Sequence, residues 1–419
     1  MRGGIPIFCL RNLESSPMLL LDGYEFISKR CNRYGTDLFE TRFMGQKVIC
    51  MRGEEAARLF YDEDRFRRKG AAPKRIQKTL FGENGVQGLD AAEHKLRKMM
   101  FLSIMVPENV ERLRRLTRKQ WEIHAAKWEG MDTLVLFDEV QKLMCQVACK
   151  WAGVPLRRRE IELRASDLGK MVDALGAIGP RYWQGRCARH RSEEWMRNMI
   201  DHIRSYSYHP RIGSAAHTIA WHYNTSGKLL STQVAAVELL NIIRPIVAIT
   251  TYIIFGALAM HQHPECRIML KEKEKGYTDQ FVQEVRRFFP FTPFIGARVK
   301  KGFLWKNHFF EKGTLVMLDV YGMNHDPRIW ENPNQFNPKR FEHWKENPYV
   351  FIPQGGGDPK YGHRCAGESV TCEVMAESLL FLANRLEYRV PKQNLDYSLR
   401  RMPTLPKSRF IIQDIKLIS

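Results

Sequence analysis

Apolar residues recur at helical spacing through most of the chain. Between residues 54 and 266 they return every three or four positions, which is the pattern of amphipathic helices packed on a core. Clusters of glycine, proline and other turn-forming residues interrupt this pattern and divide it into several helices. The interruptions lie at residues 70–73, 106–107, 130–132, 176–180 and 208–214.

Alternation of apolar and polar residues is confined to short segments. Residues 40–43 and 47–51 alternate on either side of a turn at Gly45, which predicts a small β-hairpin. Residues 300–320 alternate in the same way and predict further short strands. Strand-like pieces follow near residues 388–390 and 410–412.

These proportions predict a mainly α fold with minor β structure. The chain has no internal repeat, low-complexity linker or shift in composition that would mark a second domain. We therefore expect one large domain over residues 1–419. In it, a small β-rich part near residues 40–51 and 291–320 adjoins a helical part.

The longest apolar run, residues 235–260, contains Glu238, Asn241, Arg244 and Pro245. A membrane-spanning helix tolerates such residues poorly, so the run predicts a helix buried in a soluble protein. The N-terminal residues lack the pattern of a signal peptide. We expect no membrane anchor and a cytoplasmic location.

The balance of charge is strongly basic, with 66 Lys and Arg against 46 Asp and Glu and a formal net charge of +20. Nucleic acid, an anionic membrane surface or acidic small molecules would each suit such a charge. No zinc-finger spacing or basic recognition helix is found, which favours a solvated basic surface that attracts an anionic substrate. The nine cysteines are odd in number and irregularly spaced, as expected in a reducing compartment.

A glycine-rich loop at residues 351–367 precedes the helical pattern of residues 368–383 and contains Cys365. So many missing side chains predict a close approach of the backbone to a flat group. Backbone N–H groups and the positive end of the following helix would stabilise a thiolate, the form of cysteine that binds metal. For an isolated cysteine, a buried structural thiol is the simpler interpretation.

The loop resembles the cysteine-ligand loop of cytochromes P450, in which the thiolate is the axial ligand of haem iron. This resemblance implies a haem b cofactor ligated by Cys365. The usual arginine two residues before the cysteine is replaced here by His363, and residues 358–360 add length. Gln-Gly-Gly-Gly followed by Gly-His-Arg-Cys is similar to one branch of the family, the fatty-acid peroxygenases.

Two further signatures of the family stand in the expected order. Glu284 and Arg287 form a Glu-x-x-Arg motif, and Arg340 lies in the later Phe-Asn-Pro-Lys-Arg-Phe segment. The resemblance implies a buried ion network of these three side chains that braces the cysteine loop. On a helix near residues 91–105, His94 and Lys98 match the place where P450s bind the haem propionates. The alternative is that both lie on an exposed face.

The sequence Arg244-Pro245 departs from ordinary P450 monooxygenases, which carry an acid followed by threonine to protonate iron-bound dioxygen. A guanidinium cannot donate that proton at neutral pH. A buried arginine needs an anion, and its own helix offers none at adjacent positions. Pro245 should kink the helix and open space there. We therefore expect bidentate capture of a carboxylate by Arg244; the alternative is an internal salt bridge.

Arg-Pro at this place resembles the fatty-acid peroxygenases, which consume hydrogen peroxide directly. The resemblance implies that the substrate's carboxylate, held by Arg244, supplies the acid–base function, and that no redox partner is required. It also places Leu80, Phe81 and Gln87 beside the haem, where glutamine favours hydroxylation over decarboxylation. The side chains expected to line the acyl channel are Val172, Leu175, Phe291 and Phe294; plain core packing is their alternative.

Together these features predict a haem-thiolate peroxygenase of lipid metabolism that hydroxylates long-chain fatty acids at the α or β carbon. Its partners are then a long-chain fatty acid and hydrogen peroxide, with no nucleic acid. The sequence leaves open two alternatives. One is a fatty-acid decarboxylase that forms terminal alkenes, and the other is a haem-thiolate sensor without turnover.

Overall fold

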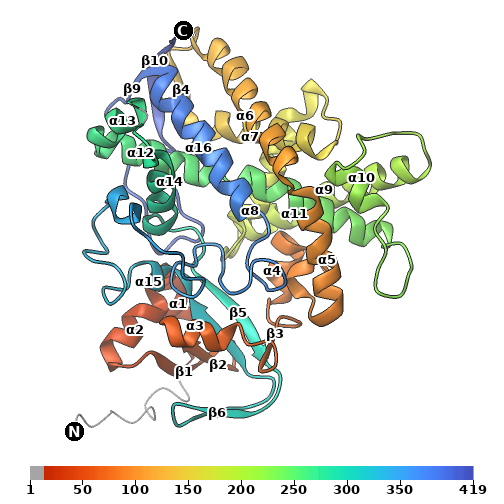
Figure 1. Ribbon diagram of the computed structural model, residues 1–419, viewed down its shortest axis with the longest axis vertical. Helices are drawn as coiled ribbons and strands as arrows, with labels where there is room; N and C mark the ends of the chain where they lie inside the picture. The colour runs from red at the N-terminus through yellow and green to blue at the C-terminus, as the bar shows by residue number, and fades with distance from the viewer. Residues whose placement is uncertain (1–13, 273, 419) are drawn as a thin grey trace.

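The computed structural model describes residues 14–272 and 274–418. Helices form one large part of the molecule, and a sheet with the small helices α1, α2, α3 and α15 forms the opposite end (Figure 1). The helices are α1 (Ser16–Asp22), α2 (Phe26–Tyr34), α3 (Glu54–Phe60), α4 (Lys74–Ile76), α5 (Ala91–Ile104), α6 (Pro107–Trp128), α7 (Leu136–Ala152), α8 (Ile161–Asp173), α9 (Pro180–Arg204), α10 (Ala215–Ala220), α11 (Thr232–Ala248), α12 (Thr250–Gln262), α13 (Pro264–Lys271), α14 (Tyr277–Phe288), α15 (Val320–Asn324) and α16 (Glu368–Asn384).

The strands are few and short, as the alternation predicts. They are β1 (Leu38–Phe43), β2 (Gln46–Met51), β3 (Phe66–Arg67), β4 (Thr133–Val135), β5 (Phe294–Val299), β6 (Phe303–Trp305), β7 (His308–Phe310), β8 (Leu315–Asp319), β9 (Leu386–Arg389) and β10 (Ile411–Leu417). The mainly α fold with minor β structure is confirmed. Residues 54–266 were expected to be mostly helical, and the structure adds to them the strands β3 and β4, which are too short to show a period.

The larger sheet has the strand order β1-β2-β8-β5-β3. The predicted hairpin is present: β1 and β2 pair antiparallel from Leu38 opposite Met51 to Phe43 opposite Gln46. Strand β8 pairs in parallel with β2 and antiparallel with β5, so the sheet combines segments that are far apart in sequence. Strands β4, β10 and β9 make a second sheet against the far end of the helical part (Figure 1).

The apolar run at residues 235–260 crosses the middle of the helical part. It forms α11 and α12 instead of one kinked helix, and the interruption lies at Ile249, one turn beyond Pro245. The N–H of Ile249 donates to the carbonyls of Pro245 and Ile246. Residues 232–262 are long and apolar enough to span a membrane, but 89% of their most apolar window is buried within the fold. This segment is therefore core.

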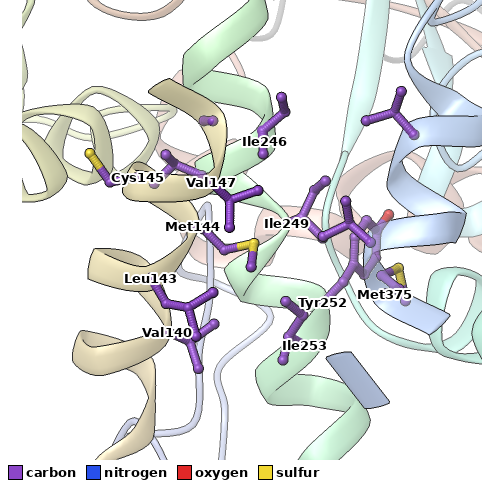
Figure 2. Close-up of a cluster of buried hydrophobic side chains, with 14 of the residues drawn as sticks. Val140, Leu143, Met144, Cys145, Val147, Ile246, Ile249, Tyr252, Ile253 and Met375 are labelled. Carbon is purple, nitrogen blue, oxygen red and sulfur yellow. The ribbon is translucent and has the colours of Figure 1, made fainter. Parts of the chain in front are cut away.

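Helix α7 packs against α11 and α12 through the largest apolar cluster. Figure 2 shows Leu143, Met144 and Val147 of α7 facing Ile246 and Ile249. Interlocking of these side chains fixes α11 in position, and α11 carries Arg244. The cysteines of α7 belong to the same buried cluster.

Candidate active site

Cys365 lies at the end of the glycine-rich loop, three residues before α16 begins at Glu368. Its N–H donates to the carbonyl of Gln354 at 3.2 Å. The side chain is accessible by surface area, yet burial raises the pKa of its thiol, opposed by a hydrogen bond from the Gly367 N–H. The sulfur is therefore accessible to a bound group although protein atoms surround it closely.

The glycines of this loop approach a flat group, which is the ring of Tyr61. The Tyr61 hydroxyl accepts a hydrogen bond from the N–H of Gly356 at 2.6 Å. A Cβ atom at Gly356 would lie 2.3 Å from the carbonyl of Pro348, and Gly357 has a φ of +77° with Tyr61 in contact. Close packing therefore explains two of these glycines, and the sequence pattern did not reveal it.

His94, Lys98 and His363 come together beside the cysteine loop. The rings of His94 and His363 stack with their centroids 3.8 Å apart. Burial, followed by the charge of Lys98, lowers the pKa of His94 to about 4. The ammonium of Lys98 donates to the carbonyl of Gly362 at 3.2 Å and to that of Arg364. The alternative of an exposed face is wrong, because His94 and Lys98 are each 3% exposed.

Arg68 adds a cation to this group that the sequence did not reveal. Its guanidinium lies 4.2 Å from the ring centroid of Phe60, and burial lowers its pKa. The backbone N–H of Arg68 donates to Asp90 at 2.6 Å, but no carboxylate oxygen of the described residues lies within 4.0 Å of the guanidinium nitrogens. Nothing in the sequence distinguishes Arg68 from the other basic residues, because its role depends on the fold bringing it to His363.

Arg244 projects from the middle of α11 and is 6% exposed. Its Nη2 donates to the side-chain carbonyl of Asn241 at 3.3 Å, while Nε has no hydrogen-bond partner. No carboxylate in residues 14–272 or 274–418 lies within 4.0 Å of it. Burial, and then the charge of Arg189, lowers the pKa of Arg244 to about 9, whereas Cys365 raises it. The alternative of an internal salt bridge is therefore wrong.

A buried carboxylate approaches Arg244 only through an intervening amide. Asn241 donates to Glu238 at 3.0 Å and to the side-chain carbonyl of Gln87 at 3.3 Å. Glu238 is fully buried and accepts a bond from Arg97 of α5. Burial raises the pKa of Glu238, and Arg97 opposes this. Glu238 can be singled out from the sequence because it is a carboxylate within an apolar run. Nothing in the sequence indicates that Arg97 is its partner.

The residues expected to contact the acyl chain occupy several elements. Leu80 and Phe81 end η3 (Gln77–Phe81), a π-helical turn, and Gln87 lies in η4 (Val86–Gly88). Val172 of α8 lines a cavity of about 30 Å³ together with Val247 and Ala248, one turn beyond Arg244. Leu175 follows α8 and Phe294 begins β5, and Phe291 stacks on Tyr252 with ring centroids 4.3 Å apart. Their roles stay predictions.

Glu284, Arg287 and Arg340 contact one another, as the resemblance implies. Arg287 donates to both carboxylate oxygens of Glu284 at 2.7 Å, and neither side chain has exposed surface. Arg340 lies 3.1 Å from Glu284. Arg287 also donates to the carbonyls of Asn324 and Pro333, which joins α14 to the segment preceding the cysteine loop.

Comparison with known proteins agrees with this geometry. The cytochrome P450 family model matches residues 267–389. The structure of a variant of cytochrome P450SP alpha (CYP152B1) superposes with a TM-score of 0.95 at 42% identity, covering 97% of this chain and 100% of that chain. The chain belongs to the cytochrome P450 superfamily.

Other solved structures place this P450 in the branch of fatty-acid peroxygenases. Cytochrome P450EX alpha (CYP152N1) with myristic acid gives a TM-score of 0.94 at 44% identity, covering 98% of this chain and 99% of that chain. A variant of cytochrome P450 OleT in complex with arachidonic acid gives 0.94 at 34% identity, again covering 98% and 99%.

The cofactor of this P450 is haem, and Cys365 supplies the thiolate ligand of the iron. The residues present fit that group. The thiol of Cys365 is accessible and accepts a hydrogen bond from the Gly367 N–H, and Arg68 and Lys98 offer cations at one side of the loop. Arg244 is close enough to Cys365 for their charges to interact.

Proposed function

We propose that this P450 uses hydrogen peroxide to hydroxylate long-chain fatty acids at the α or β carbon. The observation that carries the proposal is the unpaired guanidinium of Arg244. It is buried, it has an unpartnered Nε, and the nearest carboxylate on its helix, Glu238, is held away by Asn241. A desolvated cation in this position binds an anionic head group strongly, because no water competes for it.

In this proposal Arg244 binds the carboxylate of the fatty acid and thereby determines which carbons react. With the head group fixed, C2 and C3 are the first carbons held near the cofactor. The bound carboxylate also takes and returns the proton of hydrogen peroxide, which neither Arg244 nor Pro245 can do. Haem supplies the iron centre that transfers the oxygen atom. Gln87, bonded to Asn241, holds the other side of the head-group site.

The cluster of His94, Lys98, His363 and Arg68 would hold the carboxylates of the haem. The guanidinium of Arg68 and the ammonium of Lys98 are desolvated, and burial is the main cause that lowers the pKa of each. Burial of cations is costly unless anions join them. Two propionate groups would meet this need.

The direct test is incubation of the purified haem protein with myristic acid and hydrogen peroxide, followed by identification of the products. We expect 2- or 3-hydroxymyristic acid without any reductase. Arg244→Ala should abolish the reaction, and a short carboxylic acid added as a decoy should not restore it. Arg115→Ala, which removes an arginine that is 66% exposed, should leave turnover unchanged. Unchanged turnover of Arg244→Ala would contradict the proposed binding of the substrate carboxylate by Arg244.

The same experiment separates the alternatives. Because the chain is similar to OleT, a fatty-acid decarboxylase is the alternative enzyme. A terminal alkene as the dominant product would favour this decarboxylase over the hydroxylase. A spectral response to fatty acid without any oxidised product would favour a sensor. Turnover that requires dioxygen and a reductase would contradict the use of peroxide.

A further inference from the structure

The guanidinium of Arg189 lies at the junction of three elements around the head-group site. Arg189 is on α9 and is 2% exposed. Its Nη1 donates to the carbonyl of Leu80 at 2.9 Å, and its Nε donates to Glu193 of the same helix at 2.6 Å. The segment that Arg189 contacts is thus the π-helical turn η3, which carries Leu80 and Phe81.

Glu193 connects this contact to the helix that carries Arg244. Gln233 in the first turn of α11 donates to Glu193 at 2.8 Å, and Arg197 of α9 donates to Gln233 at 2.8 Å. The chain of hydrogen bonds therefore runs from α11 through Glu193 and Arg189 to the carbonyl of Leu80. A planar guanidinium suits this role because it holds two partners in one fixed geometry.

The backbone beyond the turn is shaped to admit Arg189. Gly82 has a φ of +82°, and a Cβ atom there would lie 2.2 Å from Nη2 of Arg189 and 2.5 Å from a methyl group of Val237. Only glycine allows the chain to pass between α9 and α11 at this point. Gly82 also donates to the carbonyl of Gln77 at 2.7 Å, which closes the turn.

A π-helical turn is rare and is frequently found at functional sites, and here it is held by contacts with its surroundings. We propose that Arg189 is a positioning residue, which locks the turn of Leu80 and Phe81 against α11 and so determines which carbon of the acyl chain is hydroxylated. This inference rests on the proposed function, because it concerns the outcome of that reaction. Arg189 does not itself contact the reacting atoms.

The inference predicts a change in product ratio with little change in head-group binding. Arg189→Lys keeps the charge but cannot hold Leu80 and Glu193 together. The selectivity between 2- and 3-hydroxy products should fall about fivefold, the effect of losing one internal hydrogen bond. KM for myristic acid should change less, because Arg244 and Asn241 are untouched. Glu193→Gln should shift the ratio in the same direction by a smaller factor.

The control is Arg191→Lys, because Arg191 is on the same helix and pairs with Asp167 of α8, not with the turn. The holoenzymes are compared by products from myristic acid and peroxide, by KM and kcat, and by Tm. Falling selectivity in Arg189→Lys and Glu193→Gln, but not in Arg191→Lys, supports the inference. An unchanged ratio in either folded variant, with or without a lower Tm, overturns it. Absence of hydroxylated product from the wild type would instead contradict the proposed function.

Discussion

At the scale of single residues, the central feature is that Arg244 makes no direct contact with Glu238, the carboxylate nearest to it on α11. Asn241 places one amide between Arg244 and Glu238, with bonds of 3.3 and 3.0 Å on its two sides. The carboxylate of Glu238 therefore does not occupy the N–H groups of Arg244. A direct contact would compete with a substrate carboxylate for the same N–H groups.

Asn241→Asp should convert this arrangement into a direct ion pair. The new carboxylate would neutralise Arg244 and weaken myristate binding by about tenfold to a hundredfold, as expected for a competing charged hydrogen bond. Spectral titration or calorimetry measures the Kd. Asn241→Ala removes the bridge without adding charge and should cost less affinity. Equal affinity in the Asp variant and the wild type would contradict this account.

The sequence identified the residues whose chemistry is unusual for their surroundings. Cys365 stands in a glycine-rich loop and Arg244 in an apolar run, so the pattern of neighbouring residues is enough to single out each of them. Arg68 and Arg189 could not be found in this way, because an arginine in a basic, partly polar stretch looks like surface. Their burial arises from contacts with distant segments, such as that between Arg189 and Leu80.

At the scale of elements, ion pairs buried in the sheet connect strands that are distant in sequence. Glu40 of β1 lies 2.9 Å from the ammonium of Lys47 on β2 and 2.8 Å from the imidazole of His308 on β7. Burial raises the pKa of Glu40, but the hydrogen bonds from His308 and Lys47 outweigh it and lower that pKa from 4.5 to about 2. The folded state thus favours the ionised carboxylate.

Glu40 should therefore contribute to the acid sensitivity of the protein. A lowered carboxylate pKa adds stability that is present above pH 4.5 and is lost as the pH falls to about 2, here roughly 3 kcal/mol. Urea unfolding of wild type and Glu40→Gln between pH 2 and pH 7 measures the difference. The variant should be less stable at neutral pH, and the two should converge in acid. Parallel curves would contradict the pKa assignment.

The buried pair of Glu284 and Arg287 makes a second prediction for the elements it joins. Glu284→Gln leaves the guanidinium of Arg287, which has no exposed surface, without its counter-charge. We expect a loss of about 3–5 kcal/mol in the free energy of unfolding. Glu331→Gln is a suitable control, since Glu331 is exposed, and should change the stability little.

The helices and the hairpin were predictable because their apolar periods extend over many residues. Strands β3 and β4 have two and three residues, so they carry no readable period and exist only through pairing with β5 and β10. Pro245 was expected to kink its helix, and it lies inside α11, which continues to Ala248. The interruption itself falls four residues later, at Ile249.

At the scale of the whole molecule, the protein carries a formal net charge of +20, and its proposed substrate is an anion. A positive field speeds the approach of carboxylates and is screened by salt. That residues 1–419 form one domain, and that the protein is cytoplasmic, stay predictions from the sequence.

The association rate of a fatty acid should therefore fall with ionic strength. Stopped-flow mixing with octanoate, which stays monomeric, should give a rate roughly tenfold lower at about 1 M salt than at about 0.01 M. Imidazole, a ligand of haem iron that is uncharged when the pH is well above its pKa, should show no such dependence under that condition. Equal salt dependence for both ligands would rule out steering by charge.

Strand β10 links segments that are made much earlier than itself. It pairs with β4, which lies between α6 and α7, and with β9, which follows α16. During translation the helices therefore emerge before the strand that joins their ends exists. Such late, long-range pairing delays completion of the fold. A ribosome-bound chain lacking residues 411–417 should accordingly remain a client of chaperones, and stable uptake of the cofactor should follow synthesis of this strand.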